Sequence, residues 1–182
     1  MIDTFPTSVD SLVDTPLRIK VVIIAGVAGV GKTKVGRCLA KNLGWGFSEG
    51  DDFHPSENLN KLKAGVPLTD EDRWPWLERL KGLIEAAIRE DLPTIVTCSL
   101  LKESYRRFLL DGFDSVRAVF LTAPDHLVAE RIDRRGPHLF PKELLQSQFE
   151  TWEEPKLGIV VDASQAPAEI VAEIKKRLLL AE

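Results

Sequence analysis

The chain has 182 residues, of which 44% are hydrophobic and 29% are charged, values typical of one folded domain and unlike those of a disordered chain. Asp and Glu outnumber Lys and Arg by 28 to 24, which gives a formal net charge of −4. This acidic balance argues against non-specific binding to nucleic acid or to an anionic membrane. No apolar run approaches the roughly 20 residues of a membrane-spanning helix. Because the chain as a whole is acidic, a site for an anionic ligand would need a local cluster of basic residues.

Residues 1–16 mix Asp, Thr, Ser and Pro without periodicity, so we expect a flexible leader before a single domain over 17–182. The start of this leader is acidic, unlike the basic start of a secretory signal. The two cysteines, Cys38 and Cys98, lie in apolar stretches and form no metal-binding or redox spacing. These features favour a cytoplasmic location, where thiols stay reduced.

Strand and helix patterns alternate along the predicted domain. Leu17–Ala25 is an apolar run rich in β-branched residues, which predicts a strand buried on both faces. A glycine-rich turn leads from it into a predicted helix over Lys32–Leu43, with Gly44 as the C-cap. Further strands are predicted at Trp45–Glu49, Thr94–Cys98, Val116–Leu121 and Gly158–Val161, and helices at Pro75–Glu90, at Leu101–Leu110, from Asp125 and up to Leu178. This alternation predicts an α/β fold with a parallel sheet covered on both faces.

The turn after the first strand contains a complete phosphate-binding motif. Its residues fit G-x-x-x-x-G-K-[ST] and are Gly26, Val27, Ala28, Gly29, Val30, Gly31, Lys32 and Thr33. The glycines allow successive main-chain N–H groups to converge on a phosphate, and the following helix directs its positive end to the same place. Lys32 adds a charge for the β- and γ-phosphate oxygens, and the Thr33 hydroxyl is a ligand for Mg²⁺. The motif predicts binding of a nucleoside triphosphate such as ATP; a strand–helix turn without a ligand is the alternative.

The rest of the chain narrows the kind of nucleotide-binding protein. The N-K-x-D string that GTP-binding switches use for guanine is absent from the sequence, and a motor ATPase needs more chain for its partner machinery. A small phosphotransferase fits better, with its acceptor site at the carboxyl edge of the sheet. The second predicted strand runs into Glu49, Asp51 and His54, where carboxylates can hold hydrated Mg²⁺ and accept a proton from an attacking hydroxyl. A solvated acidic turn that caps the next helix is the other interpretation.

Taken together, the motifs resemble the gluconate kinase (gluconokinase) family of P-loop small-molecule kinases. The resemblance extends from about Val22 to Pro155 and rests on the blocks GVAGVGKT, EGDDFHP, PLTDEDRWPWL, CSLLKESYR and RRGPHLFPKELLQSQFETWEEP. The chain departs from the family's usual residues at Leu62, Leu100, Pro137, Leu139 and Trp152. The resemblance implies a P-loop NTPase fold with a five-stranded parallel sheet, a mobile lid over about 131–148 and a homodimer.

The activity that the resemblance implies is ATP-dependent phosphorylation of D-gluconate at its 6-hydroxyl, which gives 6-phosphogluconate and ADP. The catalytic residues are then Lys32, Asp51 and Arg135. Asp51 would orient or deprotonate the acceptor hydroxyl, and orientation can suffice because a loose phosphoryl-transfer transition state needs little activation of the nucleophile. Thr33 and Glu49 would serve the Mg²⁺ ion.

Substrate contacts are implied for Asp51, His54, Arg73, Lys102, Arg106, His138 and Gln148. Lys102 and Arg106 lie four residues apart, on one face of a predicted helix, so a solvated helix face is the alternative for them. Arg131 and Arg135 form a second such pair, and Arg131 is predicted to bind the nucleotide at the base of the lid. A basic helix end that complements the helix dipole is the alternative there. The predicted partner is a small molecule, not nucleic acid or a membrane.

Two other functions remain open at this point. A shikimate-kinase-like enzyme also combines a P-loop with an acidic second strand and an arginine lid. A nucleotide-binding regulator without phosphoryl transfer would bind ATP and would release no ADP in response to an acid substrate. Turnover on gluconate and on shikimate separates these three hypotheses.

Overall fold

The computed structural model describes residues 18–134 and 143–180. The predicted leader and the middle of the predicted lid, with Arg135 and His138, lie outside these residues. Along the described chain the elements are β1 (Val21–Ala25), α1 (Lys32–Leu43), β2 (Gly46–Ser48), the 3₁₀ helix η1 (Gly50–Phe53), α2 (Ser56–Lys63), α3 (Asp70–Arg89), β3 (Thr94–Cys98), α4 (Glu103–Leu110), β4 (Val116–Thr122), α5 (Asp125–Asp133), α6 (Glu143–Thr151), β5 (Ile159–Asp162) and α7 (Pro167–Leu178).

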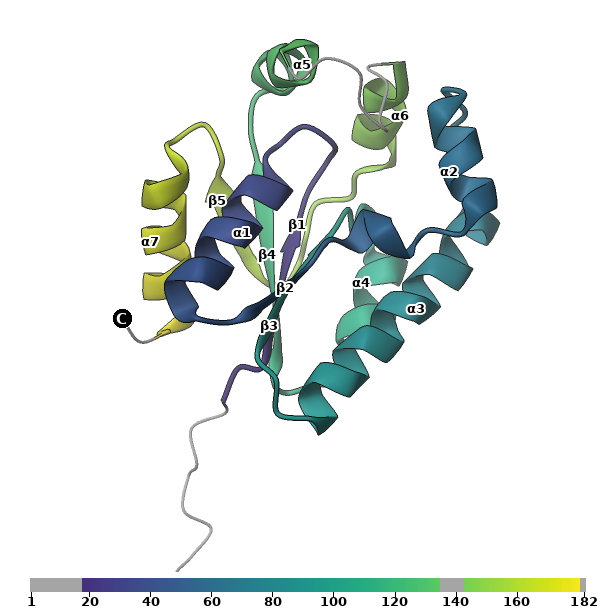
Figure 1. The fold of residues 1–182 in the computed structure, drawn as a ribbon. Helices are drawn as coiled ribbons and strands as arrows, with labels where there is room; N and C mark the ends of the chain where they lie inside the picture. Colours follow the sequence, from purple (N-terminus) through teal and green to yellow (C-terminus); the bar gives the residue numbers. More distant parts are fainter. Residues whose placement is uncertain (1–17, 135–142, 181–182) are drawn as a thin grey trace, which may run out of the picture.

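The strands form one five-stranded sheet in the order β2-β3-β1-β4-β5, and every neighbouring pair is parallel. This confirms the predicted α/β fold. β1 is the central strand, with Val21 paired to Thr94 of β3 on one side and to Val116 of β4 on the other. The chain connections diverge around β1, and open parallel sheets bind ligands at the carboxyl end of the strand where this happens. The loop that follows β1 lies at this edge (Figure 1).

Helices cover both faces of the sheet (Figure 1), and successive residues of β1 alternate between two hydrophobic cores. Val22 and Ile24 pack in the core that contains α1 and α7 residues, whereas Val21 and Ile23 pack with residues of α3 and α4. All four side chains are fully buried. Burial on both faces explains why this segment is a continuous apolar run and not an alternating pattern.

Helix α3 begins at Asp70, well before the predicted start at Pro75. A reciprocal capping box sets this boundary: Asp72 N donates to Thr69 Oγ1 (3.3 Å), and Thr69 N donates to Asp72 Oδ2 (3.0 Å). These bonds satisfy N–H groups that lack partners at a helix start, so Pro75 lies inside the helix. As a consequence Arg73 belongs to α3, where its side chain is buried.

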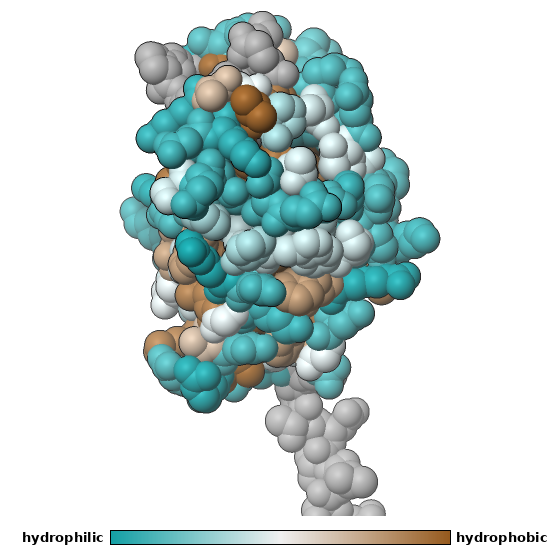
Figure 2. Space-filling model, turned by 90° about the vertical axis from the view of Figure 1, so that its right-hand side faces the viewer, coloured by the Kyte–Doolittle hydropathy of each residue, from teal (hydrophilic) through white to brown (hydrophobic). Residues whose placement is uncertain are grey.

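The face of the molecule that carries α2 and α3 is mainly hydrophilic, as Figure 2 shows. Its apolar residues occur there in small separate groups. Within residues 18–134 and 143–180, no helix has both the length and the apolar character needed to cross a membrane.

Candidate active site

The phosphate loop turns sharply between β1 and α1. Gly26, Gly29 and Gly31 have φ angles of 137°, 79° and 119°, in the left-handed region that favours glycine. A Cβ on Gly26 would lie 2.5 Å from the main-chain oxygen of Leu121, and a Cβ on Gly29 would lie 2.6 Å from Cγ1 of Ile132. Among the described residues no side chain caps the start of α1, so the helix directs main-chain N–H groups toward the space where an anion would bind.

An open pocket lies against this loop, and residues from much of the sheet's carboxyl edge line it. The predicted site residues that line it are Ala28, Gly29, Gly31, Lys32, Thr33, Asp51, His54, Arg73 and Gln148. The lining is completed by Leu62, Leu68, Ser99 and Ile132. The space among these residues is about 740 Å³, which includes open solvent. The structure therefore joins the predicted nucleotide and acceptor residues in one pocket.

Close packing against β3 fixes the segment that presents Asp51 to the pocket. Gly50 N donates to Thr97 Oγ1 (3.0 Å), and Trp76 Nε1 donates to Gly50 O (2.7 Å). A Cβ on Gly50 would lie 1.9 Å from the main-chain oxygen of Thr97, so only glycine fits there. The Thr97 hydroxyl also donates to Glu49, whose side chain does not line the pocket. Of the two predicted carboxylates, Asp51 is the one at the reaction pocket.

His54 is a buried pocket residue held by two neighbours. Its ring stacks on Trp76, with centroids 4.3 Å apart and planes 16° from parallel. Its Nδ1 lies 3.2 Å from Nδ2 of Asn58. Burial, with a smaller contribution from the Arg73 cation, lowers the pKa of His54 from 6.5 to about 4. The ring is therefore neutral at neutral pH.

Arg73 gives the pocket a buried positive charge. Only 7% of its surface is exposed, and it lines the pocket from the first turn of α3. Within the described part of the chain its guanidinium forms no hydrogen bond or ion pair. Its guanidinium lines the open pocket, where an anionic ligand would pair with it. Arg73 is therefore the best-placed candidate for binding a carboxylate in this pocket.

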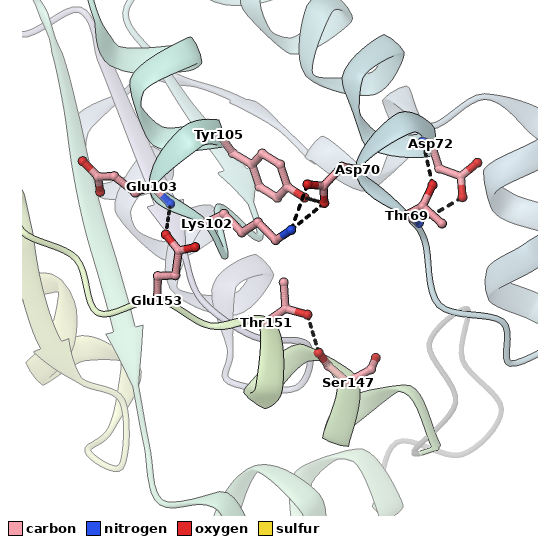
Figure 3. A network of polar contacts seen from close by, with 9 residues as sticks. All are labelled: Thr69, Asp70, Asp72, Lys102, Glu103, Tyr105, Ser147, Thr151 and Glu153. Carbon is pink, nitrogen blue, oxygen red and sulfur yellow. Dashed lines mark hydrogen bonds and ion pairs between the residues drawn. The ribbon is translucent and has the colours of Figure 1, made fainter.

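Lys102 does not line the pocket, contrary to the substrate contact expected of it. Its Nζ donates to both carboxylate oxygens of Asp70, at 2.7 and 2.8 Å, and the Tyr105 hydroxyl donates to the same carboxylate at 2.6 Å. Figure 3 shows both side chains pointing at Asp70. These hydrogen bonds hold the pKa of Asp70 below its ordinary value of 3.8. The cluster connects the start of α4 to the start of α3.

Arg106 also lies outside the pocket, in the core under α4. It is 3% exposed, and its guanidinium lies between the rings of Phe120 and Trp152, 4.9 and 5.1 Å from their centroids. Nε donates to Leu100 O and Nη2 to Leu101 O, both at 3.0 Å, and Nη2 also donates to the main-chain oxygen of Glu153. In this structure Arg106 therefore connects the segment after β3 to the segment after α6, and its substrate contact stays a prediction.

A second pocket shares Gly29 and Gly31 with the first and extends toward the loop that follows β5. Arg131 lines it from α5 and anchors itself to two main-chain oxygens: Nη1 donates to Val30 O (2.8 Å) and Nη2 to Ala163 O (2.7 Å). The predicted nucleotide residue Arg131 is therefore held directly against the phosphate loop.

Two hydrogen bonds engage the phosphate loop from its pocket side. Ala28 N donates to Gln148 Oε1 at 2.7 Å, and Lys32 Nζ donates to Val27 O at 3.0 Å. Gln148 is 4% exposed and comes from α6, the described end of the predicted lid. Gln148 thus contacts the phosphate loop, and its predicted substrate contact stays a prediction.

The chain is similar in sequence to known proteins. A family model described as an AAA domain matches residues 21–155. The thermosensitive gluconokinase of Escherichia coli (strain K12) is 40% identical over 134 residues, which cover 74% of this chain and 72% of that protein. The chain belongs to the gluconokinase family.

Two solved structures resemble this gluconokinase-family chain over most of its length. A sugar kinase from Janibacter sp. HTCC2649 has a TM-score of 0.83 and 40% sequence identity, covering 90% of this chain and 96% of that one. A gluconokinase from Sinorhizobium meliloti 1021 has a TM-score of 0.69 and 39% identity, covering 89% and 97%. The family resemblance predicted from the motifs is confirmed.

Some site residues of this gluconokinase-family chain were not assigned from the sequence. Ser99 lines the pocket directly after β3, a position that the end of the predicted strand could have indicated. Leu62 and Ile132 line it from α2 and α5, but their helical spacing looks like that of ordinary core residues. Asn58 contacts Nδ1 of His54, and no local sequence pattern predicts that contact.

Proposed function

We propose that this chain is a gluconokinase, which transfers the γ-phosphoryl group of ATP to the 6-hydroxyl of D-gluconate and yields 6-phosphogluconate and ADP. The observation that carries the proposal is the composition of one pocket. A phosphate loop, a carboxylate at Asp51 and the Arg73 cation, which has no hydrogen bond or ion pair among the described residues, all line it. These three features match a polyphosphate, an acceptor hydroxyl and a substrate carboxylate, in that order.

The nucleotide would occupy the phosphate loop with its triphosphate. Main-chain N–H groups of the loop and the start of α1 suit the phosphate oxygens, and Lys32 lies on the same pocket wall. The second pocket, which Arg131 lines, is the natural site for the rest of the nucleotide. Thr33 fits a Mg²⁺ ligand because it lines the pocket from the first turn of α1 and carries a hydroxyl group. When bound, Mg²⁺ would neutralise phosphate charge.

The acceptor would lie on the opposite wall of the pocket. Arg73 suits its carboxylate because a guanidinium can donate two parallel hydrogen bonds to the two oxygens. Asp51 and His54 would meet hydroxyl groups. In the transfer, the 6-hydroxyl oxygen forms a bond to the γ-phosphorus, the bond from that phosphorus to the bridging oxygen of ADP breaks, and the hydroxyl proton passes to Asp51. Because the transition state is loose, orienting the hydroxyl is the larger part of this task.

A coupled assay of ADP release tests the proposal and its rivals. We expect ADP release with D-gluconate and none above background with shikimate, together with a phosphate monoester at the 6-position in the ³¹P spectrum of the product. Release with shikimate alone would replace the proposal by a shikimate-kinase-like activity. ATP binding without release on either acid would favour a nucleotide-binding regulator.

Three further features complete the proposal. The lid over about 131–148 would close over ATP, with Arg135 and His138 contributing from residues outside the described part. The reaction consumes ATP, which favours the cytoplasm as the location. The homodimer implied by the family stays a prediction, and sedimentation equilibrium of the purified chain would test it.

A further inference from the structure

Asn58 lies directly behind the pocket residue His54. It is in α2 and only 3% exposed. Its Nδ2 is 2.7 Å from the main-chain oxygen of Asp72 and 3.2 Å from Nδ1 of His54. One buried amide group therefore bridges the start of α3 and the imidazole ring.

The contact with Asp72 fixes which way round the Asn58 amide stands. A main-chain carbonyl oxygen is only an acceptor, so the group 2.7 Å from it must be the NH₂ and not the amide oxygen. The NH₂ has a second hydrogen, and its other neighbour is Nδ1 of His54. Nδ1 must then carry a lone pair. A neutral imidazole has one N–H, which is consequently on Nε2.

The surroundings keep the ring in this state. Stacking on Trp76 holds its plane, and the Trp76 indole is itself fixed by its hydrogen bond to Gly50 O. The Arg73 cation and burial both disfavour a charged imidazolium.

The other ring nitrogen faces the pocket. His54 lines the pocket, and its Nε2 has no hydrogen-bond partner among the described residues. Among those residues, Arg106 Nη1 is the only fully buried side-chain nitrogen or oxygen without such a partner. Because Asn58 occupies Nδ1 and His54 lines the pocket, Nε2 is the ring nitrogen left to meet a pocket ligand.

We propose that Asn58 is a positioning residue that holds His54 as the neutral Nε2–H tautomer, so that His54 donates a hydrogen bond to an oxygen lone pair of the acceptor and does not take its proton. The ligand group is a hydroxyl or carboxylate oxygen of a polyhydroxylated acid. This part of the inference rests on the proposed function, whereas the tautomer is a property of the protein alone.

The assignment divides the work between two pocket residues. A fixed N–H donor at His54 cannot serve as a base at Nε2, so Asp51 is left to receive the acceptor's proton. A hydroxyl can accept one hydrogen bond and donate another. His54 would donate a hydrogen bond to the hydroxyl oxygen and Asp51 would accept one from the hydroxyl proton, so the two residues together would select a hydroxyl group.

The direct test is ¹⁵N NMR of the ligand-free, full-length protein with labelled histidine at neutral pH. We expect Nδ1 of His54 to show the shift of an unprotonated nitrogen and Nε2 that of a protonated one. The exposed His126 of α5 is a second labelled ring in the same spectrum. A protonated Nδ1 of His54, or averaged shifts at its two ring nitrogens, would overturn the proposal.

A variant tests the role of Asn58. In Asn58→Asp the carboxylate can only accept, so we expect His54 to move its proton to Nδ1 and the KM for the acid substrate to rise at least tenfold, with the KM for ATP within twofold of wild type. Asn60→Asp, an exposed change on the same helix, should alter neither property. An unchanged His54 spectrum in Asn58→Asp would refute the positioning role.

The two proposals fail in distinguishable ways. If the wild-type chain shows the expected tautomer but no turnover of gluconate, the proposed function is wrong and the Asn58–His54 assignment stands. If gluconate is turned over and Nδ1 is protonated, the proposed function stands and the Asn58–His54 assignment is wrong. Should Asn58→Asp not fold, the wild-type spectrum decides the tautomer without it.

Discussion

The side-chain oxygen of Gln148 accepts a 2.7 Å hydrogen bond from the main-chain N–H of Ala28, although 120 positions separate the two residues in the sequence. Gln148 belongs to α6 and Ala28 to the phosphate loop, so one buried contact connects α6 to the loop. An oxygen of Gln148 therefore lies within the space that a triphosphate would approach. A negative charge placed on this side chain should therefore weaken nucleotide binding.

Gln148→Glu keeps an acceptor for Ala28 N but adds a negative charge beside the phosphate loop. Like charges about 4 Å apart repel by roughly 1–4 kcal/mol, depending on exposure to water, and about 1.4 kcal/mol corresponds to a tenfold change in affinity. We expect the Kd for ATP, measured by calorimetry, to rise at least tenfold. Gln146→Glu makes the same change at an exposed site on the same helix and should bind ATP normally. Equal effects of the two changes would refute a local contact.

Asp51→Asn removes the pocket carboxylate that would receive the acceptor's proton. General-base groups contribute roughly 100- to 10,000-fold to rate, so we expect kcat to fall at least about 100-fold while the Kd for ATP stays near that of wild type. Asp52→Asn changes the exposed neighbour in the same 3₁₀ helix and should retain turnover. If Asp51→Asn weakened ATP binding and spared kcat, the carboxylate would belong to the nucleotide site.

Arg73→Gln removes the buried cation assigned to the substrate carboxylate. We expect the KM for gluconate to rise about 100-fold, because a charge-assisted bond to a carboxylate contributes roughly 1.5–3 kcal/mol. The free energy of unfolding should change little, because Arg73 lines an open pocket and forms no hydrogen bond or ion pair with another described residue. Arg89→Gln, exposed at the far end of α3, is the matched control. A loss of stability without a change in KM would indicate a structural role instead.

Arg106→Lys distinguishes a positioning role from a substrate clamp. Lysine keeps the charge but cannot reproduce the guanidinium bonds to three main-chain oxygens. We expect urea denaturation to show a loss of about 2–4 kcal/mol, whereas Arg107→Lys on the exposed side of α4 should change stability by less than about 0.5 kcal/mol. Wild-type stability with a large rise in the KM for gluconate would restore the clamp hypothesis.

The fold could be predicted because its signals are local. The β-branched run before Gly26 and the helix pattern after Gly31 encode a strand, a turn and a helix within one short stretch. Repetition of this pattern leaves few arrangements other than a parallel sheet covered by helices. The start of α3 was misplaced at Pro75, because the reciprocal bonds of Thr69 and Asp72 decided the boundary.

The site was predictable only where a residue's direction follows from its place at the end of a strand. Asp51 follows β2 and therefore reaches the pocket at the sheet's edge. For Lys102 and Arg106, the four-residue spacing gives a shared helix face but not the neighbour that this face meets. That neighbour is set by distant segments, the ring of Trp152 among them. Contacts between remote parts of the chain cannot be read from spacing.

The neutral, buried His54 should make folding stability depend on pH. Its pKa is about 4 in the folded protein against 6.5 in an exposed state, so between these values the unfolded chain binds more protons than the native one. Stability from this group is therefore complete above pH 6.5 and is lost as the pH falls toward 4. Between pH 7 and pH 5 the loss should be about 2 kcal/mol. The carboxyls of Asp70 and Asp72, whose pKa values lie below 3.8, act only at lower pH.

Urea denaturation of wild type, His54→Gln and His126→Gln at pH 7 and pH 5 measures this dependence. His54→Gln should lose most of the pH-dependent change, whatever its absolute stability, because the group that takes up the proton on unfolding is gone. His126→Gln removes an exposed ring on α5 and should keep the wild-type slope. A wild-type protein equally stable at both pH values would mean that His54 is protonated in the native state as easily as in the unfolded chain, and its burial against Trp76 would then not explain its charge.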